Sequence, residues 1–387
     1  MVKFVMATCF SKEDNNCGEK ALKYINNAFD GMEQQVVVLD LESMNEDTLH
    51  RFIDMGAIDC VSFTADALNN SRCKDALVRT LGINSRQKKN IKFINVFDGR
   101  SKESVTYAKL LGRVLLDKNC GATLSHIDIN ADENLFIQNL QGIRNSAVRE
   151  REMLQEREKY ILDFTSKIVG NIEKGKDEYT GKHIRSVCKI AEIIAKNLGI
   201  QHKDIDILKI GALLHDVGKQ DVSDGVLKKP TRLTDEEFQE MRAHVLMGEV
   251  ELNQFDFGEY ERVKKIAAEH HEKYDGTGYP RGLKGEEIDV LSRIVSLADA
   301  TQAMLGRNYQ RSKTKSELIS ELNSCAGTQF DPKMVAVLCD VLETSPQSMY
   351  LSYDEDGKIK YEVPTTEELI SHLEKEREDR RREYFQE

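Results

Sequence analysis

Histidine and aspartate residues recur through the second half of the chain in a pattern suited to holding metal ions. His215 and Asp216 follow the apolar run GALL, and His270 and His271 open the run HHEKYDGTGYP. Imidazole and carboxylate groups are ligands for first-row divalent metals, and the two oxygens of one aspartate can bridge two ions. We therefore interpret the chain as a hydrolase with a two-metal centre.

Six of the nine histidines lie within residues 175–343, where the candidate metal ligands follow one another as His183, His215, Asp216, His244, His270, His271 and Asp299. A single buried histidine is more often a hydrogen-bonded core residue than a ligand, and a bare HD or HH pair carries little information. A buried carboxylate beside several imidazoles, however, needs a cation to offset the cost of its desolvation. The combination therefore favours a metal site.

Composition and charge disfavour several classes of protein. The 387 residues carry a formal net charge of -11, which disfavours non-specific binding to a nucleic acid polymer. The eight cysteines form no C-x-x-C pair, which argues against a disulfide frame or zinc ribbon and favours a reducing cytosol. Charged residues follow the first apolar stretch too early for a signal peptide, and no run reaches membrane-spanning length. We expect a soluble, cytoplasmic protein with no membrane partner.

The hydrophobic pattern predicts a multidomain chain of α/β and all-α parts. Residues 1–131 alternate apolar runs with amphipathic stretches, which predicts a doubly wound parallel α/β domain. Residues 132–174 predict a long connector helix, residues 175–343 an all-helical domain, and residues 344–387 a hairpin followed by a charged helix. Apolar positions recur about every seven residues along the connector, so we expect a homodimer through it. A single amphipathic helix packed on its own domain is the alternative.

The layout of the front α/β domain resembles that of a response-regulator receiver in degenerate form. Asp66, after the run SFTA, is the nearest candidate for a phosphorylated aspartate, and no clear lysine ends the last strand. Phosphoryl signalling is therefore disfavoured, and a divergent sensory or dimerising domain is the preferred interpretation. Such a domain could bind a small ligand at the carboxyl ends of its strands.

A series of motifs in the helical domain resembles the successive motifs of the HD-GYP family: HIRSV, LLHDVGK, LKKPTRLTDEE, HVLMG, HHEKYDGTGYPRGLKGEEI, SRIVSLADA and GTQFDP. The resemblance covers roughly residues 175–343. It implies a metal-dependent phosphodiesterase that opens cyclic di-GMP, in a family of which some members are degraded into binding proteins.

The resemblance also implies how the ligands divide. His183, His215, Asp216 and Asp299 would hold one ion, and Asp216 would bridge to a second ion held by His244, His270 and His271. Some family members hold a third ion through a glutamate four residues before the first histidine. Tyr179 occupies that position here, so we predict two ions. Nitrogen and oxygen ligands without a thiolate suit iron or manganese, with zinc as a further option.

Other positions would contact the substrate or assist catalysis, as the resemblance implies. Lys219 would contact a phosphate oxygen, and Asp224 would act on a leaving-group proton or in a supporting contact. The predicted substrate-binding residues are Lys219, Asp275, Gly278, Tyr279, Pro280, Arg307 and Arg311, with Tyr279 offering an aromatic face to a guanine. The segment after Asp299 departs from the family pattern, because Gln302 replaces a second aspartate and the following basic segment is one residue shorter.

The main hypothesis is hydrolysis of cyclic di-GMP to linear pGpG and then GMP by a hydroxide that bridges two metal ions. The departures after Asp299 leave two alternatives open. One is a catalytically weak or inactive cyclic di-GMP receptor, and the other is a phosphohydrolase acting on another cyclic dinucleotide.

Overall fold

The computed structural model describes residues 4–9, 17–30, 32, 36–40, 58, 60–64, 92–97, 123–128, 133–175, 178–229, 231–305, 313–344, 351–353, 359–361 and 363–386. The contacts divide the chain into two compact units: residues 1–156 with 381–387, and residues 157–380. The structure therefore describes an α/β unit and a helical unit, each considered by itself below.

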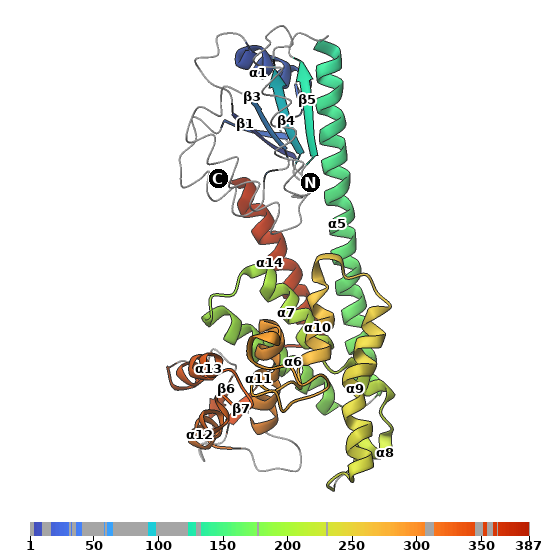
Figure 1. Cartoon of the computed structure of the whole chain (residues 1–387), viewed down its shortest axis with the longest axis vertical. Helices are drawn as coiled ribbons and strands as arrows, with labels where there is room; N and C mark the ends of the chain where they lie inside the picture. Colours follow the sequence, from blue (N-terminus) through green and yellow to red (C-terminus); the bar gives the residue numbers. More distant parts are fainter. Residues whose placement is uncertain are drawn as a thin grey trace. The chain divides into compact units, whose positions relative to one another are not determined.

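The α/β unit contains five parallel strands in the order β2-β1-β3-β4-β5 (Figure 1). They are β1 (Phe4–Cys9), β2 (Val36–Asp40), β3 (Cys60–Thr64), β4 (Lys92–Phe97) and β5 (Thr123–Asp128). On one face, Phe4, Met6 and Ile94 pack against apolar residues of α1 (Cys17–Ala28) and of the first part of α5 (Glu133–Gly175).

Residues that alternate with these, such as Val5 and Val61, are also fully buried, as expected where a parallel sheet is covered on both faces. Asp66 lies outside the described residues. The parallel sheet agrees with the predicted class, while its doubly wound form stays a prediction. The helix α5 lies over the predicted connector segment, but the structure does not test dimerisation through it.

The helical unit is built mainly of helices from the second half of the chain. After α5 come α6 (Glu178–Asn197), α7 (His202–Leu214), η2 (Val217–Asp221), α8 (Asp224–Leu227), α9 (Asp235–Asn253), η3 (Gly258–Tyr260), α10 (Arg262–Glu269), η4 (Gly285–Glu287), α11 (Val290–Leu305), α12 (Lys315–Cys325), α13 (Pro332–Thr344) and α14 (Thr366–Gln386). The strands β6 (Leu351–Tyr353) and β7 (Ile359–Tyr361) pair antiparallel. The turn between them lies outside the described residues.

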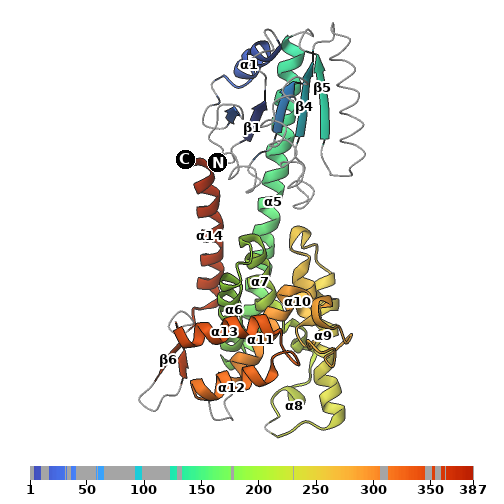
Figure 2. The same cartoon turned by 60° about the vertical axis from the view of Figure 1, so that its left-hand side comes forward.

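The helix α7 lies at the centre of this unit, because its residues from Ile205 to Leu214 are all buried. Apolar side chains from α6, α10 and α11 pack around it in one continuous core, and Figure 2 shows these helices grouped together. Most of these residues are apolar, and the two charged ones, Asp206 and Lys209, have ionic partners on α14, so the helix can be buried on all sides. The residues directly after α7, His215 and Asp216, are therefore held at a fixed position inside the unit.

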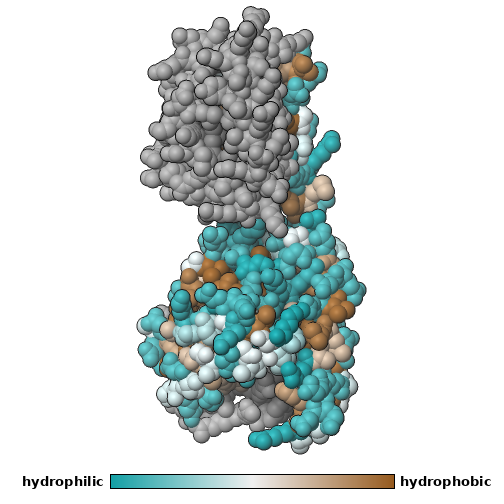
Figure 3. Space-filling view, viewed as in Figure 1, coloured by the Kyte–Doolittle hydropathy of each residue, from teal (hydrophilic) through white to brown (hydrophobic). Residues whose placement is uncertain are grey.

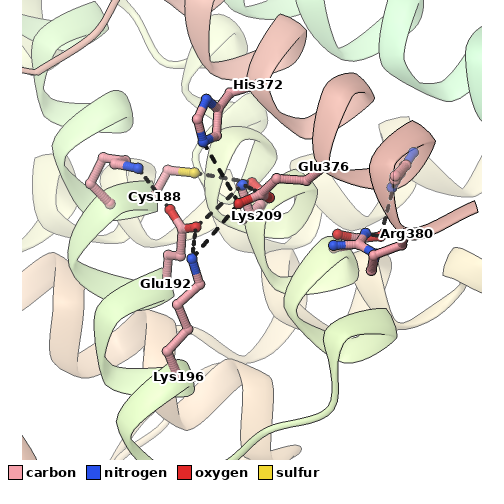
Figure 4. A network of polar contacts seen from close by, with 10 residues as sticks. Cys188, Glu192, Lys196, Lys209, His372, Glu376 and Arg380 are labelled. Atoms are coloured by element: carbon pink, nitrogen blue, oxygen red, sulfur yellow. Dashed lines mark hydrogen bonds and ion pairs between the residues drawn. The ribbon is translucent and has the colours of Figure 1, made fainter. Parts of the chain in front are cut away.

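The C-terminal helix α14 packs on α6 and α7 through a buried ionic cluster (Figure 4). We define the lysine–glutamate cluster as Lys189, Glu192, Lys196, Lys209 and Glu376. Lys209, only 2% exposed, lies 3.0 Å from Glu376 and 3.4 Å from Glu192, and both Lys189 and Lys196 lie 2.8 Å from Glu192. Each carboxylate therefore faces at least two ammonium groups, which offsets the cost of burying them.

The visible face of the helical unit is mostly hydrophilic, with separate apolar patches (Figure 3). The exposed large apolar residues on α9 are Phe238, Leu246 and Val250. Within the part of the chain that the structure describes, no helix is both long and apolar enough to cross a membrane.

Candidate metal centre

Five segments that are far apart in the sequence deliver the candidate ligands to one place. His183 lies on α6, His244 on α9 and Asp299 on α11. His215 and Asp216 follow the end of α7, and His270 and His271 follow the end of α10. The seven residues form two groups, and within each group the ligand atoms lie within 4.8 Å of one another. One group is Asp216, His244, His270 and His271, and the other is His183, His215 and Asp299.

The carboxylate of Asp216 lies between these two groups. Its Oδ2 atom lies 3.6 Å from Nε2 of His183 and 3.2 Å from Nε2 of His215. Its Oδ1 atom faces the other group, 3.4 Å from Nε2 of His244 and 3.7 Å from Nε2 of His270. Asp299 belongs to the group of His183 and His215, and its Oδ1 lies 3.3 Å from Nε2 of His183. One carboxylate with its oxygens directed to separate imidazole sets is the arrangement a bridging ligand requires.

Three of the histidines are oriented by the same local hydrogen bond. Nδ1 of His215, His244 and His270 donates to the carbonyl three residues earlier in each case, on Ala212, Met241 and Ala267, at 2.8, 2.5 and 2.9 Å. Because a carbonyl can only accept, Nδ1 carries a proton, and in the neutral ring Nε2 then keeps its lone pair. The helix geometry therefore directs three Nε2 atoms to the centre.

His183 is oriented by a side chain instead. Its Nδ1 lies 2.5 Å from Oε1 of Gln302, one turn after Asp299 on α11, and the side chain of Gln302 is fully buried. An amide oxygen accepts from Nδ1–H as a carbonyl does, so Nε2 is again left facing Asp216. Sequence analysis identified Gln302 only as a departure from the family pattern, and its contact with His183 depends on the packing of α6 against α11.

The electrostatics of the centre are those of a crowded, desolvated set of charges. Burial alone would raise the pKa of Asp216, but His215 and Lys219 hold it well below its usual value. Burial alone would lower the pKa of His183, but Asp216 and Asp299 raise it to about 9. Burial lowers the pKa of His271 to about 3. The pKa directions thus favour ionised Asp216 and Asp299 and neutral His270 and His271, which are the protonation states that bind metal.

These residues fit a metal ion on a structural criterion as well. Nε2 of His215 and Oδ1 of Asp216 are buried and have no hydrogen-bond partner in the described part of the chain. A buried polar atom without a partner is costly, and metal ions held by the two groups would give these atoms partners. The set of five imidazoles and two carboxylates matches the ligands that divalent transition metals use.

A close backbone contact brings the two groups together. A Cβ atom on Gly218, in η2, would lie 2.0 Å from the carbonyl oxygen of His244 and 2.4 Å from the backbone nitrogen of Gly248. Only glycine at position 218 leaves room for α9 to approach the segment after Asp216 this closely. The separation of Asp216 and His244 is therefore set by backbone atoms.

The loop after His271 is held by polar contacts of its own. Glu272 is buried and accepts from the backbone nitrogens of Arg281 and Leu283, at 2.7 and 3.1 Å. Asp275 accepts from the backbone and hydroxyl of Thr277, and its own backbone nitrogen donates to the carbonyl of Thr328 in the GTQFDP motif. This motif therefore supports the loop.

Gly278 allows the loop to fold back, because a Cβ atom there would lie 2.2 Å from the backbone nitrogen of Lys273. The bond between Tyr279 and Pro280 is cis. Asp275 and Gly278 thus have local structural contacts, and their predicted contact with a substrate stays a prediction.

Tyr279 lies beside the candidate metal ligand His271, and its ring is in contact with two side chains. It stacks on His271, with ring centroids 4.9 Å apart and planes inclined by 22°. The guanidinium of Arg242, from α9, lies over the same ring at 4.4 Å from the centroid. A ring in contact with both groups offers less surface to a guanine than the sequence suggested, and Arg242 was not among the predicted residues.

The other predicted residues fall in different places. Nζ of Lys219 lies 2.5 Å from Oδ2 of Asp216, so this lysine is at the centre. Asp224 is exposed at the start of α8, pairs with Lys228 at 2.9 Å and belongs to neither ligand group. Arg307 and Arg311 lie outside the described residues, as does the side chain of Tyr179.

Comparison with known proteins agrees with this geometry. The profile of the family described as "HD domain" matches residues 167–334, the segment that contains every candidate ligand. Residues 167–334 form an HD domain of the HD-GYP type. The expectation drawn from the motifs is thereby confirmed, and the GYP triplet of this type is the Gly278-Tyr279-Pro280 sequence described above.

Curated relatives of this HD domain have names that refer to cyclic dinucleotides. A 3'3'-cGAMP-specific phosphodiesterase of Vibrio cholerae is 35% identical over 44% of this chain and 33% of its own length. A cyclic di-GMP phosphodiesterase of Thermotoga maritima is 33% identical over 48% of this chain and 50% of its own length. A cyclic di-GMP phosphodiesterase response regulator of Xanthomonas campestris is 36% identical over 48% of both chains. The matches thus span a third to a half of these relatives.

Proposed function

We propose that the chain is a metal-dependent phosphodiesterase that hydrolyses cyclic di-GMP to linear pGpG and GMP. The observation that carries the proposal is the position of Asp216, whose two oxygens face separate groups of imidazoles. The names of the curated relatives support a cyclic dinucleotide as the substrate.

Seven residues would hold two divalent ions, iron or manganese in the first place and zinc as a further option. His183, His215 and Asp299 would serve one ion, His244, His270 and His271 the other, and Asp216 both. When bound, such ions supply positive charge to the phosphate under attack and lower the pKa of a water molecule toward neutrality.

The remaining steps depend on the chain's own residues. The four Nδ1 hydrogen bonds to Ala212, Met241, Ala267 and Gln302 fix the imidazole rings before substrate arrives. Lys219 is anchored next to Asp216 and would direct its ammonium group toward a non-bridging phosphate oxygen. The loop of Asp275, Gly278, Tyr279 and Pro280 would border the substrate, and Asp224, Arg307 and Arg311 stay proposed contacts.

The proposal is tested by incubating the full chain, loaded with iron or manganese, with cyclic di-GMP and separating the products by chromatography. Linear pGpG followed by GMP is the expected result. The matched control is Asp216→Asn, which keeps the volume and removes the bridging charge. Absence of product from the metal-loaded protein with every divalent ion, or equal product from the control, would contradict the proposal.

A second candidate substrate is 3'3'-cGAMP, because one of the relatives named above is specific for it. Gln302 stands where the family pattern has a second aspartate. A cyclic di-GMP receptor with weak or no catalysis is therefore a further alternative. Parallel assays of turnover and of binding with both dinucleotides separate these alternatives.

For the chain as a whole we propose the domain boundaries 1–131, 132–174, 175–343 and 344–387, with a doubly wound sensory domain at the front. We further propose a cytoplasmic homodimer through the connector helix. Exposed apolar residues on α5, Leu135, Met153 and Tyr160, are available for such a contact. Sedimentation of the full chain beside variants with these residues replaced by glutamate tests it.

A further inference from the structure

Among the described residues, some basic side chains near the candidate metal centre are paired with a carboxylate, and one is not. Lys219 is paired with Asp216. Arg281, which follows Pro280, makes two contacts of 2.6 Å with the carboxylate of Glu249. Arg242 contacts no acidic side chain within the described part of the chain, and its contacts there are with the rings of Tyr279 and Phe238. Its N–H donors therefore remain available to a ligand.

Arg242 lies close to the candidate metal ligands. The residue lies on α9 two positions before His244, and its guanidinium rests on Tyr279, which in turn stacks on His271. The guanidinium is thus one aromatic ring beyond a candidate metal ligand. A cation stacked on a ring loses little side-chain freedom when it binds, because the ring has already fixed its plane.

The chemistry of Arg242 matches one part of the proposed substrate. A cyclic dinucleotide carries two phosphodiester groups, of which one must lie at the metal centre to be cleaved. The chain has a net charge of -11, so the second phosphate needs a local cation that is not already paired. A planar guanidinium offers two parallel N–H donors to the two free oxygens of such a phosphate.

We infer that Arg242 binds the phosphate of the cyclic dinucleotide that is not being cleaved, with Tyr279 holding the guanidinium in place. This inference rests on the proposed function and names a substrate-binding residue for it. Recognition through phosphate is independent of the bases, so Arg242 contributes equally to every cyclic dinucleotide that the centre accepts.

The test compares Arg242→Gln with the wild-type full chain on cyclic di-GMP, 3'3'-cGAMP and cyclic di-AMP. For each dinucleotide that is a substrate, we expect KM to rise on the order of tenfold, the effect of losing a hydrogen bond to a charged group. Bis(p-nitrophenyl) phosphate has one phosphate and no base, so its hydrolysis should be unchanged. Metal content, measured on the same samples, should also be unchanged.

Two further variants sharpen the result. Arg281→Gln removes the same charge beside the same loop but from an arginine already paired with Glu249, so KM should stay within about twofold of wild type. Arg242→Lys keeps the charge without the planar pair of donors and should give an intermediate KM.

Three outcomes overturn the inference. The first is an Arg242→Gln variant with wild-type KM for every dinucleotide. The second is a rise confined to substrates that contain guanine, which would assign Arg242 to a base edge. The third is a parallel loss of bis(p-nitrophenyl) phosphate hydrolysis and of bound metal, which would make Arg242 a structural residue.

Failure of the proposed function is recognised separately. If the wild-type chain does not turn over any dinucleotide, the dissociation constant of cyclic di-GMP is measured by titration for both proteins. Weaker binding to Arg242→Gln then supports the inference in a receptor. Equal binding, or no binding to the wild-type chain, contradicts it.

Discussion

The helices α6 and α7 contribute to two buried ionic clusters, and the two are neutralised in different ways. In the lysine–glutamate cluster, Glu192 and Glu376 are surrounded by ammonium groups that the chain itself supplies. At the metal centre, Asp216 faces mainly imidazoles, and its Oδ1 atom has no hydrogen-bond partner among the described residues. The chain's own ammonium groups neutralise the first cluster, whereas we propose that the second is neutralised by added cations.

The largest expected effect comes from removing the charge between the two histidine groups. Asp216→Asn should lower kcat on the order of a thousandfold or more, because both proposed ions would lose the negative charge that they share. The metal content of the purified protein should fall with it. Urea unfolding of the metal-free variant should stay close to that of the metal-free wild type. A variant that keeps its metal and its activity would remove the distinction between the two clusters.

Removing a charge from the lysine–glutamate cluster should instead affect stability. Lys209→Met leaves the buried carboxylate of Glu192 and its partner Glu376 with one ammonium group fewer, which should cost about 3 kcal/mol of unfolding free energy. Urea unfolding measures this cost. Lys196→Met serves as the control, since this side chain is 49% exposed and should cost less than about 1 kcal/mol. Equal costs for the two variants would show that burial of Lys209 is not what matters.

A smaller effect should follow from disturbing a supporting hydrogen bond at the metal centre. Gln302→Leu removes the acceptor for Nδ1 of His183 and should weaken metal binding by roughly 10- to 100-fold. Competition with a metal indicator measures the affinity. Gln302→Glu restores an acceptor and should recover most of it, while a leucine variant with wild-type affinity would show that α6 alone orients His183.

The smallest effect concerns the pH dependence of the lysine–glutamate cluster. Burial opposes ionisation of Glu192, but Lys209 and Lys189 lower its pKa from 4.5 to about 2. A carboxyl with a lowered pKa in the folded state stabilises above its unfolded value and loses that contribution as the pH falls toward the folded value. Between pH 7 and 3.5, the stability advantage of wild type over Glu192→Gln should therefore shrink by about 1 kcal/mol. Urea unfolding at both pH values measures it, and a constant difference would contradict the lowered pKa.

The sequence predicted the candidate ligands that the structure groups together, but not the residues around them, and the reason is physical. Metal-ligand chemistry restricts His215, Asp216 and the other candidate ligands to a few residue types, so their pattern can be recognised from the sequence alone. Their convergence in two groups agrees with that prediction, although their role as ligands stays a proposal. Arg242 and Gln302 could not be found in this way, because their contacts depend on how α9 meets the loop and how α6 meets α11.

The fold likewise has features that the sequence predicted and features that it did not. Apolar runs predicted the parallel strands, since strands buried on both faces need continuous apolar residues. The strand order and the ionic attachment of α14 were not predicted, because they depend on contacts between residues distant in sequence, such as Lys209 and Glu376. Periodicity describes which face of an element is apolar and leaves its partner undefined.

The contact of Gly218 with α9 has a consequence for judging related sequences. A methyl group at that position would force the backbones of η2 and α9 apart. It would move His244 away from Asp216 without altering any candidate ligand. A chain could therefore possess every metal-binding side chain and still be unable to close its reaction centre. The presence of the histidines and aspartates is therefore not sufficient to infer catalytic activity in a related sequence. The glycine of the HDVGK motif, Gly218 here, should be required as well.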